Sequence, residues 1–510
     1  MNPPALGSAG APPTIRRLAG DDAGPAVAAL LAAGARHVTS AAADEREGGG
    51  GFRVDHAFAL PGRPALEVLR LRLPAERPAH PTLVGVLPAL HWDEREARDL
   101  LGIEPLGHPD PRRLVLPDDW PQGLHPLRWD VPRDAHPPAG PSGWAPRVAD
   151  GDGVLLMPVG PVHAGIIESG HFALSLMGET ILHLDLRLFQ KHRGLEKALE
   201  GLAWAEAGEI VERTCAACSA SHQAAWCEAV EQVLAWALPP RAVYLRTVLL
   251  ECERLYNHLG DIAAIPAGTG FTVASMEGAV LKERMLRLQA GLFGHRYLFG
   301  SIRPGGVRRD LPAGEVPGLR RELAGLRLRL GRLTQRLQRH PGFLDRLQGT
   351  GLLAPSVARD LGAVGPSARA SGIAADLRLD RPHLAYRDLA PLLVTETEGD
   401  VGARLRVRLR EAEVSFALLD RLLHALPPGA WTSEPPPGEA EGLGIGCNES
   451  PRGQNAHYLE LRAGRIARYR IRSAAFANWP LVMAAAPGNL LGDFPLINKS
   501  FELCYACCDR

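Results

Sequence analysis

The chain has 510 residues, of which 46% are hydrophobic and 22% charged, as is typical of a globular protein. Lys and Arg together number 57, and so do Asp and Glu, so the formal net charge is zero. Because nucleic-acid binding normally needs a basic excess, this balance excludes nucleic acid as the expected partner.

The length and the apolar pattern indicate a multidomain chain without a membrane span. A chain of this length exceeds one ordinary hydrophobic core, so two or three domains are expected. No apolar run reaches the roughly 18 residues that a transmembrane helix needs. Residues 1–14 are rich in Pro, Ala and Gly and lack the basic start of a signal peptide, which predicts a disordered lead-in.

The first predicted domain covers residues 15–132 and mixes helix with strand. Residues 26–35 form an alanine-rich helix candidate, while residues 52–60 and 65–73 alternate polar and apolar side chains as half-buried strands do. Residues 133–150 are rich in Pro, Gly, Asp and Ala, a composition that predicts a linker.

The second predicted domain, residues 151–510, is mainly helical. Its helix candidates have apolar residues every three or four positions and lack strong breakers; they are residues 195–210, 221–238, 243–259, 276–298, 319–337 and 400–426. A loop is expected at 429–446, and two alternating stretches, 457–461 and 466–471, predict a small hairpin. The predicted fold class is α+β, with an α/β domain ahead of a mainly helical one.

Two Cys-x-x-Cys pairs in the second domain indicate a metal site. All eight cysteines lie at position 215 or later, and Cys215-Ala-Ala-Cys218 has a distant counterpart in Cys504-Tyr-Ala-Cys507. Four thiolates brought together by folding can bind a soft metal. A structural zinc site usually takes its ligands from neighbouring positions, whereas nearly 300 residues separate these pairs. Spacing alone leaves a catalytic metal site on one side, and a zinc site or a coincidence of spacing on the other, equally open.

The first domain carries a charged segment, Trp92–Ile103, that predicts a helix with a solvated face of i,i+3 and i,i+4 ion pairs. Its paired residues are Glu94, Arg95, Arg98 and Asp99. Together with Gly107–Arg113 and His125–Arg128, this segment resembles the 30-kDa-type subunit of respiratory complex I and its counterparts in membrane-bound hydrogenases. The resemblance implies a peripheral docking domain without a cofactor, whose Arg and Asp residues contact other subunits.

The second domain resembles the large subunit of nickel-iron hydrogenases, specifically the energy-converting, formate-hydrogenlyase type related to complex I (group 4). The segments that carry the resemblance are Gly160–His171, His192–Glu196, Glu212–Cys218, Glu449–Gly453 and Cys504–Arg510. These segments occur along the chain in the same order as in the family. The chain departs from the family at Ala216, where Gly is usual, and at Glu502-Leu503, which replace Asp-Pro.

The resemblance implies a ligand set for a nickel-iron centre. Cys215 and Cys504 would bind nickel alone, while Cys218 and Cys507 would bridge nickel to an iron that carries carbon monoxide and cyanide. Glu196 would bind a magnesium-type ion below the centre, since carboxylate oxygen suits a hard cation. No further cysteine motif is present, so we expect no iron-sulfur cluster in this chain.

The resemblance also implies residues that handle protons. Heterolytic cleavage of dihydrogen gives a hydride and a proton, which needs a base. A terminal thiolate or Arg452 would receive the proton, and Glu168 would relay it, with a pKa raised by burial. His163, His171 and Glu502 would surround the centre.

The expected function is therefore that of a hydrogenase catalytic subunit, an oxidoreductase that cleaves or evolves dihydrogen. Its electrons would pass to an iron-sulfur small subunit, and complex I-like membrane subunits would hold it on the cytoplasmic face of the cell membrane as a peripheral protein.

Two alternatives stay open. One is a subunit of the NADH–quinone oxidoreductase C/D type that has lost its metal and binds quinone, although it would not need four thiolates. The other is a zinc-stapled scaffold, which leaves Glu168 and Arg452 without a role.

Overall fold

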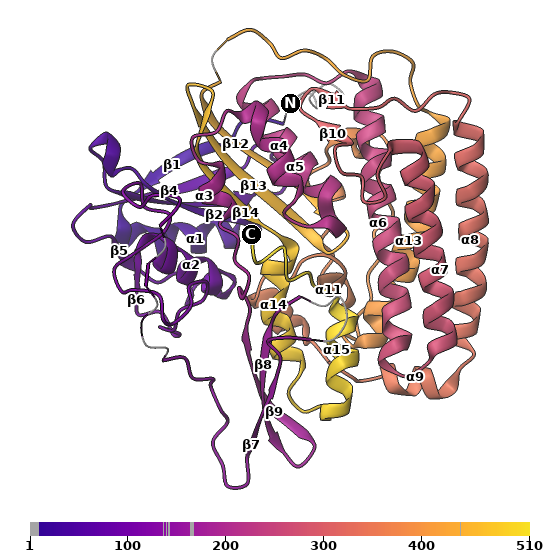
Figure 1. Cartoon of the computed structure of the whole chain (residues 1–510), viewed down its shortest axis with the longest axis horizontal. Coiled ribbons are helices and arrows are strands. Elements are labelled where there is room, and N and C mark those ends of the chain that lie inside the picture. Colours follow the sequence, from indigo (N-terminus) through magenta and orange to yellow (C-terminus); the bar gives the residue numbers. More distant parts are fainter. Residues whose placement is uncertain (1–9, 136, 139, 141–142, 164–167, 439) are drawn as a thin grey trace.

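The computed structural model describes residues 10–135, 137–138, 140, 143–163, 168–438 and 440–510. Most of the predicted lead-in, and positions 136, 139, 141 and 142 of the predicted linker, lie outside the described residues. Figure 1 shows an N-terminal α/β part on one side, a bundle of long helices on the other, and a three-stranded sheet between them. No helix in the described ranges is long and apolar enough to cross a membrane.

The N-terminal part is built on a four-stranded sheet with the strand order β1-β4-β3-β2. The strands are β1 (Thr14–Leu18), β2 (Arg36–Asp44), β3 (Phe52–Ala59) and β4 (Glu67–Leu73). Helices α1 (Ala23–Ala32) and α2 (His91–Leu101) and the short strands β5 (Ala79–Pro81) and β6 (Glu104–Leu106) complete it. The two predicted strands are therefore confirmed as β3 and β4, and the predicted helix begins three residues earlier than expected.

The helical bundle consists of α6, α7, α8 and α13, which pack side by side (Figure 1). Their bounds are α6 (Pro240–Gly268), α7 (Thr272–Phe293), α8 (Val316–Gln338) and α13 (Val401–His424). In α8 the leucines at 319, 323, 326, 330, 333 and 337 are buried while the arginines between them face outward. This three- and four-residue spacing is the amphipathic pattern that made the helix predictable.

Shorter elements join the bundle to the rest of the fold. They are β7 (Leu155–Val159), β8 (His171–Met177), β9 (Thr180–Arg187), α3 (Leu195–Leu199), α4 (Trp204–Glu212), α5 (Ser219–Val233), β10 (Ile302–Arg303), β11 (Gly306–Val307), α9 (Pro341–Leu347), α10 (Pro355–Asp360), α11 (Gly365–Ala370), α12 (Leu377–Asp380), α14 (Ala474–Ala485) and α15 (Phe494–Phe501). The single helix predicted at 195–210 is wrong: it breaks into α3 and α4, with Gly201 between them at a φ of 78°.

The central sheet is larger than the predicted hairpin. It contains β12 (Gly442–Ser450), β13 (Gly453–Arg462) and β14 (Arg465–Arg472), all antiparallel. β12 falls partly in the segment predicted as a loop. A Cβ atom on Gly446 would lie 1.9 Å from the carbonyl oxygen of Ala225 in α5. The glycines that suggested a loop thus allow the strand to approach the helix backbone closely.

The N-terminal part shares its core with the second domain. Trp92 of α2 packs edge-on against Phe476 of α14, with ring centroids 5.4 Å apart. Asp93, Glu94, Arg95, Glu96 and Asp99 of α2 are all buried. The solvated charge face expected for this helix is therefore wrong, because α2 is covered by its own loops and by the second domain.

Candidate metal centre

The two cysteine pairs meet. Sγ of Cys215 lies 3.2 Å from Sγ of Cys504, and the sulfurs of Cys215, Cys504 and Cys507 all lie within 4.8 Å of one another. Hydrogen bonds from Cys215 and Cys507 lower the pKa of the Cys218 thiol to about 6. Cys504 is half-buried and the other three are buried, so the cluster lies just below the surface.

Helix α6 positions the first cysteine loop. The Glu253 carboxylate accepts hydrogen bonds from the backbone N–H groups of Ala220 (2.7 Å) and Ser221 (3.0 Å) at the start of α5. The Tyr256 hydroxyl and the Asn257 amide donate to the Ala217 carbonyl, at 2.8 and 2.7 Å. Bonds of this kind satisfy backbone groups that a helix start leaves unpaired. The thiols of this loop are therefore held on a rigid helix.

The second cysteine loop is tied to Glu168 and Arg193. Oε2 of Glu168 accepts a hydrogen bond from the Ala506 N–H at 2.7 Å, within the Cys504–Cys507 loop. Burial and the neighbouring Cys504 thiol raise the pKa of Glu168. The Arg193 guanidinium donates to four carbonyl groups, those of Arg213, Thr214, Ala506 and Asp509. Arg193 thus joins the two cysteine loops directly.

Arg193 is a residue that the sequence reasoning missed, although it belongs to the His192–Glu196 segment that was singled out. We expect Arg193→Met to lower the free energy of unfolding by about 1–3 kcal/mol, because four partly exposed hydrogen bonds are lost. Thermal unfolding and limited proteolysis of the Cys504–Cys507 loop measure this effect. Lys191→Met is the control, since Lys191 is an exposed neighbour of like charge. Equal melting temperatures for the two variants would contradict the proposal that Arg193 holds the two cysteine loops together.

Arg452 lies in the turn between β12 and β13, with its side chain held from two directions. Nε donates to the Glu502 carbonyl at 2.6 Å, and Nη2 donates to the Asp261 carboxylate at 2.9 Å. Nη1 is buried and has no hydrogen-bond partner in the described part of the chain. Burial opposes the charge, but Asp261 and the Cys218 thiol raise the pKa of Arg452 above its usual range. Arg452 is therefore a fixed cation with one donor to spare.

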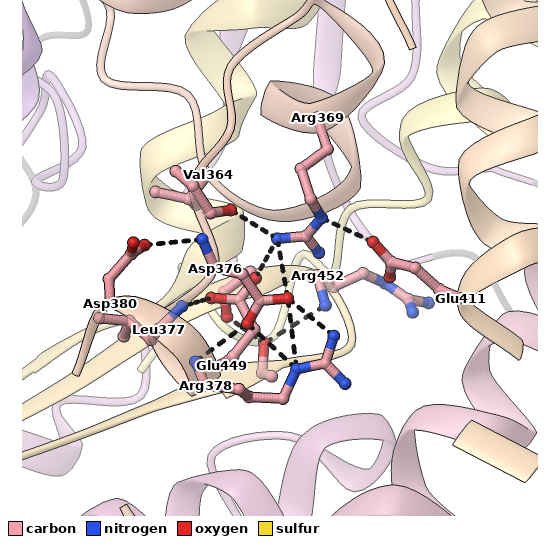
Figure 2. A network of polar contacts seen from close by, with 12 residues as sticks. Val364, Arg369, Asp376, Leu377, Arg378, Asp380, Glu411, Glu449 and Arg452 are labelled. Atoms are coloured by element: carbon pink, nitrogen blue, oxygen red, sulfur yellow. Dashed lines mark hydrogen bonds and ion pairs between the residues drawn. The ribbon is translucent and has the colours of Figure 1, made fainter. Parts of the chain in front are cut away.

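A network of buried ion pairs lies next to this turn (Figure 2). Arg369 of α11 pairs with Glu411 of α13 at 2.6 Å and with Glu449 of β12 at 2.8 Å. Arg378 pairs with Asp376 at 2.7 Å. These contacts fix the end of β12 just ahead of Arg452. Desolvation of the charges offsets much of their attraction, so pairs of this kind are weak evidence for added stability.

A chain of three side chains leads away from Cys507. Nε2 of His222 lies 3.6 Å from Sγ of Cys507, and its Nδ1 lies 2.9 Å from Nε2 of His457. Nδ1 of His457 in turn contacts the Tyr469 hydroxyl. Burial lowers the pKa of His222 to about 3, so its ring is neutral. If Tyr469 donates to His457 and His457 to His222, the Nε2–H of His222 donates to Cys507. His222 follows Cys218 by four positions, a spacing that the sequence reasoning did not use.

The donor set fits soft metals. Four thiols, of which Cys218 has a lowered pKa, suit nickel and iron. The Cys218 and Cys504 thiols are close enough to Arg452 to raise its pKa. A four-thiolate zinc site would use the same sulfurs. The geometry of the sulfurs alone therefore fits a metal site and does not identify the metal.

The surroundings of Glu196 do not fit the magnesium-type ion that the resemblance implies. Its oxygens lie 2.9 Å from Nε of Arg510 and 3.3 Å from Nη2 of Arg468, and they accept the Ile471 N–H at 3.1 Å. Burial works against its charge, yet Arg470, Arg510 and Arg468 lower the pKa of Glu196 to about 2. A divalent cation would need these oxygens and would be repelled by the guanidinium groups.

The other predicted residues lie around the centre in different ways. His163 contacts the Gly170 carbonyl at 2.7 Å, whereas His171 packs against Trp144 at a ring distance of 5.2 Å. Burial raises the pKa of the Glu502 carboxyl to about 7, with Asp261 adding to the effect. Ala216 is exposed, so the methyl group that distinguishes it from glycine does not crowd the ligand loop.

Comparison with protein families accounts for most of the chain. Residues 20–137 match the respiratory-chain NADH dehydrogenase 30 Kd subunit family. Residues 193–260 match the nickel-dependent hydrogenase family, and residues 269–441 match the respiratory-chain NADH dehydrogenase 49 Kd subunit family. The fold and the site thus define a complex I-related hydrogenase large subunit fused to a 30-kDa-type domain.

Individual relatives show which hydrogenases within this class the chain is similar to. The chain is 35% identical to formate hydrogenlyase subunit 5 of Escherichia coli K12, covering 92% of this chain and 83% of the relative. It is 34% identical to hydrogenase-4 component G of the same organism, covering 92% and 82%. A chain of the archaeal membrane-bound sulfane sulfur reductase superposes with a TM-score of 0.66 at 27% identity, covering 70% and 98%. The chain belongs to the energy-converting nickel-iron hydrogenase large-subunit family and is an oxidoreductase.

Proposed function

We propose that this chain is the catalytic large subunit of a membrane-associated nickel-iron hydrogenase. The observation that carries the proposal is the meeting of Cys215 and Cys504, 3.2 Å apart, in a chain of this family. Cys215, Cys218, Cys504 and Cys507 would hold nickel and iron, the iron carrying carbon monoxide and cyanide. When bound, this centre supplies reversible heterolytic cleavage of dihydrogen.

The residues of the chain would handle the proton and the charge. Arg452 cannot accept a proton, because Asp261 and the nearby thiols keep it protonated. It would instead stabilise negative charge on the thiolates. Glu168, at 2.7 Å from the backbone of the second cysteine loop, would receive the proton from the thiolate side and pass it outward. His222 would hold the Cys507 sulfur through its N–H group.

An iron-sulfur subunit would accept the electrons at the exposed edge of the cluster. Cys504 is half-buried, and Ala216 within the first cysteine loop is exposed. Electron transfer needs a redox group to approach the metals closely, and this edge offers the approach. We propose that the partner covers it and that this chain contains no cluster of its own.

The chain would sit peripherally on membrane subunits. Its relatives include an E. coli formate hydrogenlyase subunit and a chain of an archaeal respiratory membrane complex. We propose the cytoplasmic face of the cell membrane as its location. We also propose the domain division 15–132 and 151–510, with the first domain packed on the second as described above.

The second candidate is a quinone-binding subunit of the NADH–quinone oxidoreductase C/D type. The two NADH dehydrogenase family matches favour it. Such a subunit would have no need for four converging thiols, and they are what sets the two candidates apart.

Elemental analysis of the purified complex tests the proposal. We expect about one nickel per large-subunit chain, iron in excess of nickel because the iron-sulfur partner also contains iron, and no zinc, together with dye reduction that depends on dihydrogen. Infrared bands of carbon monoxide and cyanide would identify the iron. Zinc alone would favour a scaffold, and a metal-free protein that binds quinone would favour the second candidate.

A further inference from the structure

A cluster of buried charges lies beside the second cysteine loop. Arg468, Arg470 and Arg472 occupy alternate positions of β14 and are all buried, as is Arg510. Side chains two residues apart on a strand point to the same face, so β14 presents three guanidinium groups together. The described carboxylates that pair with these four arginines are Glu196 and Glu200 of the second domain and Asp93 and Glu96 of α2.

Glu96 of the N-terminal domain is central to the cluster. Its Oε2 accepts a hydrogen bond from Nη2 of Arg510 at 2.6 Å, and its Oε1 lies 2.9 Å from Nε of Arg470 in an ion pair. The same two arginines contact Oε1 of Glu196, Arg510 at 2.9 Å and Arg470 at 3.6 Å. Glu96 and Glu196 therefore hold Arg510 and Arg470 between them. Both guanidinium groups also lie over the Phe476 ring, at 4.9 and 5.1 Å from its centroid.

The charges balance only when both domains contribute. Four arginines face two carboxylates of the second domain, Glu196 and Glu200, which leaves two uncompensated positive charges. Asp93, at 3.5 Å from Arg470 and 3.6 Å from Arg472, and Glu96 supply the other two negative charges. Uncompensated charge is costly to bury, so the second domain needs α2 at this position.

The cluster is connected to the metal centre through the backbone. Arg510 follows Cys507 by three positions, and between them the Asp509 carbonyl accepts hydrogen bonds from Arg193. The Cys507 carbonyl accepts from the Ser473 hydroxyl at 3.1 Å, one residue beyond β14. A shift of Arg510 or of β14 would thus move the loop that carries Cys504 and Cys507.

We propose that this arginine cluster takes the place of a divalent cation beside the metal centre, and that Glu96 of the N-terminal domain positions the second cysteine loop through Arg510. The inference rests on the proposed function of that loop. It gives the N-terminal domain a part in shaping the centre, in addition to any docking role. Glu96 is a positioning residue, since it touches neither the sulfurs nor the reacting atoms.

The first test is the magnesium content of the purified wild-type complex that contains nickel and iron. We expect far less than one magnesium per chain, even after incubation with magnesium chloride. One tightly held magnesium per chain would overturn the cation replacement. Absence of nickel and iron from the wild type would instead reject the proposed function, so the two failures are distinguishable.

The second test compares Glu96→Gln with Glu94→Gln. Glu94 lies two residues away on α2 and is equally buried, but it accepts hydrogen bonds from Thr82 and Leu83 within its own domain. We expect Glu96→Gln to shift the infrared bands of the iron-bound diatomic ligands and to lower the dye-reduction rate about ten- to a hundredfold, as small misplacements do. Glu94→Gln should leave the band positions unchanged.

Band positions separate positioning from a purely structural role, because a loss of stability alone does not move them in the molecules that remain folded. Should Glu96→Gln fail to fold, Glu96→Asp keeps the charge while shortening the reach to Arg510, and it is expected to shift the bands as well. Wild-type band positions in the folded Glu96 variant would overturn the positioning role.

Discussion

Cys504→Ser is expected to abolish nickel binding and dihydrogen-dependent dye reduction. A hydroxyl is a harder and much less acidic ligand than a thiol, so it does not replace a thiolate on nickel. Losing a group that merely supports a metal ligand already costs about 10- to 100-fold, and losing the ligand should cost about a thousandfold or more. Elemental analysis and the dye assay measure both effects on the purified complex.

Cys227→Ala is the matched control for this substitution. Cys227 is a buried free cysteine of α5. It belongs to the core of the helical part and is not one of the four cysteines of the candidate metal centre. We expect it to keep its nickel and its activity. Retention of nickel by Cys504→Ser would reject the ligand assignment.

Glu168→Gln is expected to slow proton exchange about 100-fold or more while the metals stay bound. Gln keeps the shape and the hydrogen bond that the Glu168 side chain accepts from Ala506, but it cannot take up a proton. Exchange between dihydrogen and deuterated water measures the step directly, and elemental analysis measures the metals. Loss of nickel in this variant would show that Glu168 is structural.

The same substitution should change the pH dependence. Burial and the Cys504 thiol raise the pKa of Glu168, so its carboxyl stays protonated to a higher pH than an exposed one. Dihydrogen oxidation needs the deprotonated form as acceptor, so the wild-type rate should rise as the pH rises through this pKa. The rise should be missing in Glu168→Gln and present in Glu179→Gln, an exposed control on the β8–β9 turn. A rise that persists in Glu168→Gln would assign the relay to another group.

Helices with strong amphipathic spacing were predictable from the sequence, and the glycine-rich strand was not. α8 shows its leucines at every third or fourth position, a pattern set by the helix itself. β12 carries Gly442, Gly444 and Gly446, which a local reading assigns to a loop. The glycines are needed because α5 lies against the strand, and this contact depends on residues more than 200 positions away.

In the candidate site, too, residues within sequence motifs were predictable, and residues that act through tertiary contacts were not. The four cysteines, Glu168 and Arg452 could be picked out because they stand in recognisable segments. The partners of Arg452 could not, since Asp261 is one of three acidic residues on a long helix and nothing in the local sequence marks it. Likewise, the charges of α2 follow a pattern that usually indicates a solvated face. Only the packing of the second domain against Trp92 buries Asp93 and Glu96.

The wide separation of Cys215 and Cys504 along the chain has a consequence for biosynthesis. They are 289 positions apart, and a ribosome that adds roughly 5–20 residues per second needs about 15–60 s to synthesise the interval. During that time the first two thiols have no partners and are open to oxidation or to the wrong ion. A four-thiolate centre would be completed only after translation of the second pair, and cellular factors that shield the nascent thiols would raise the yield of active enzyme.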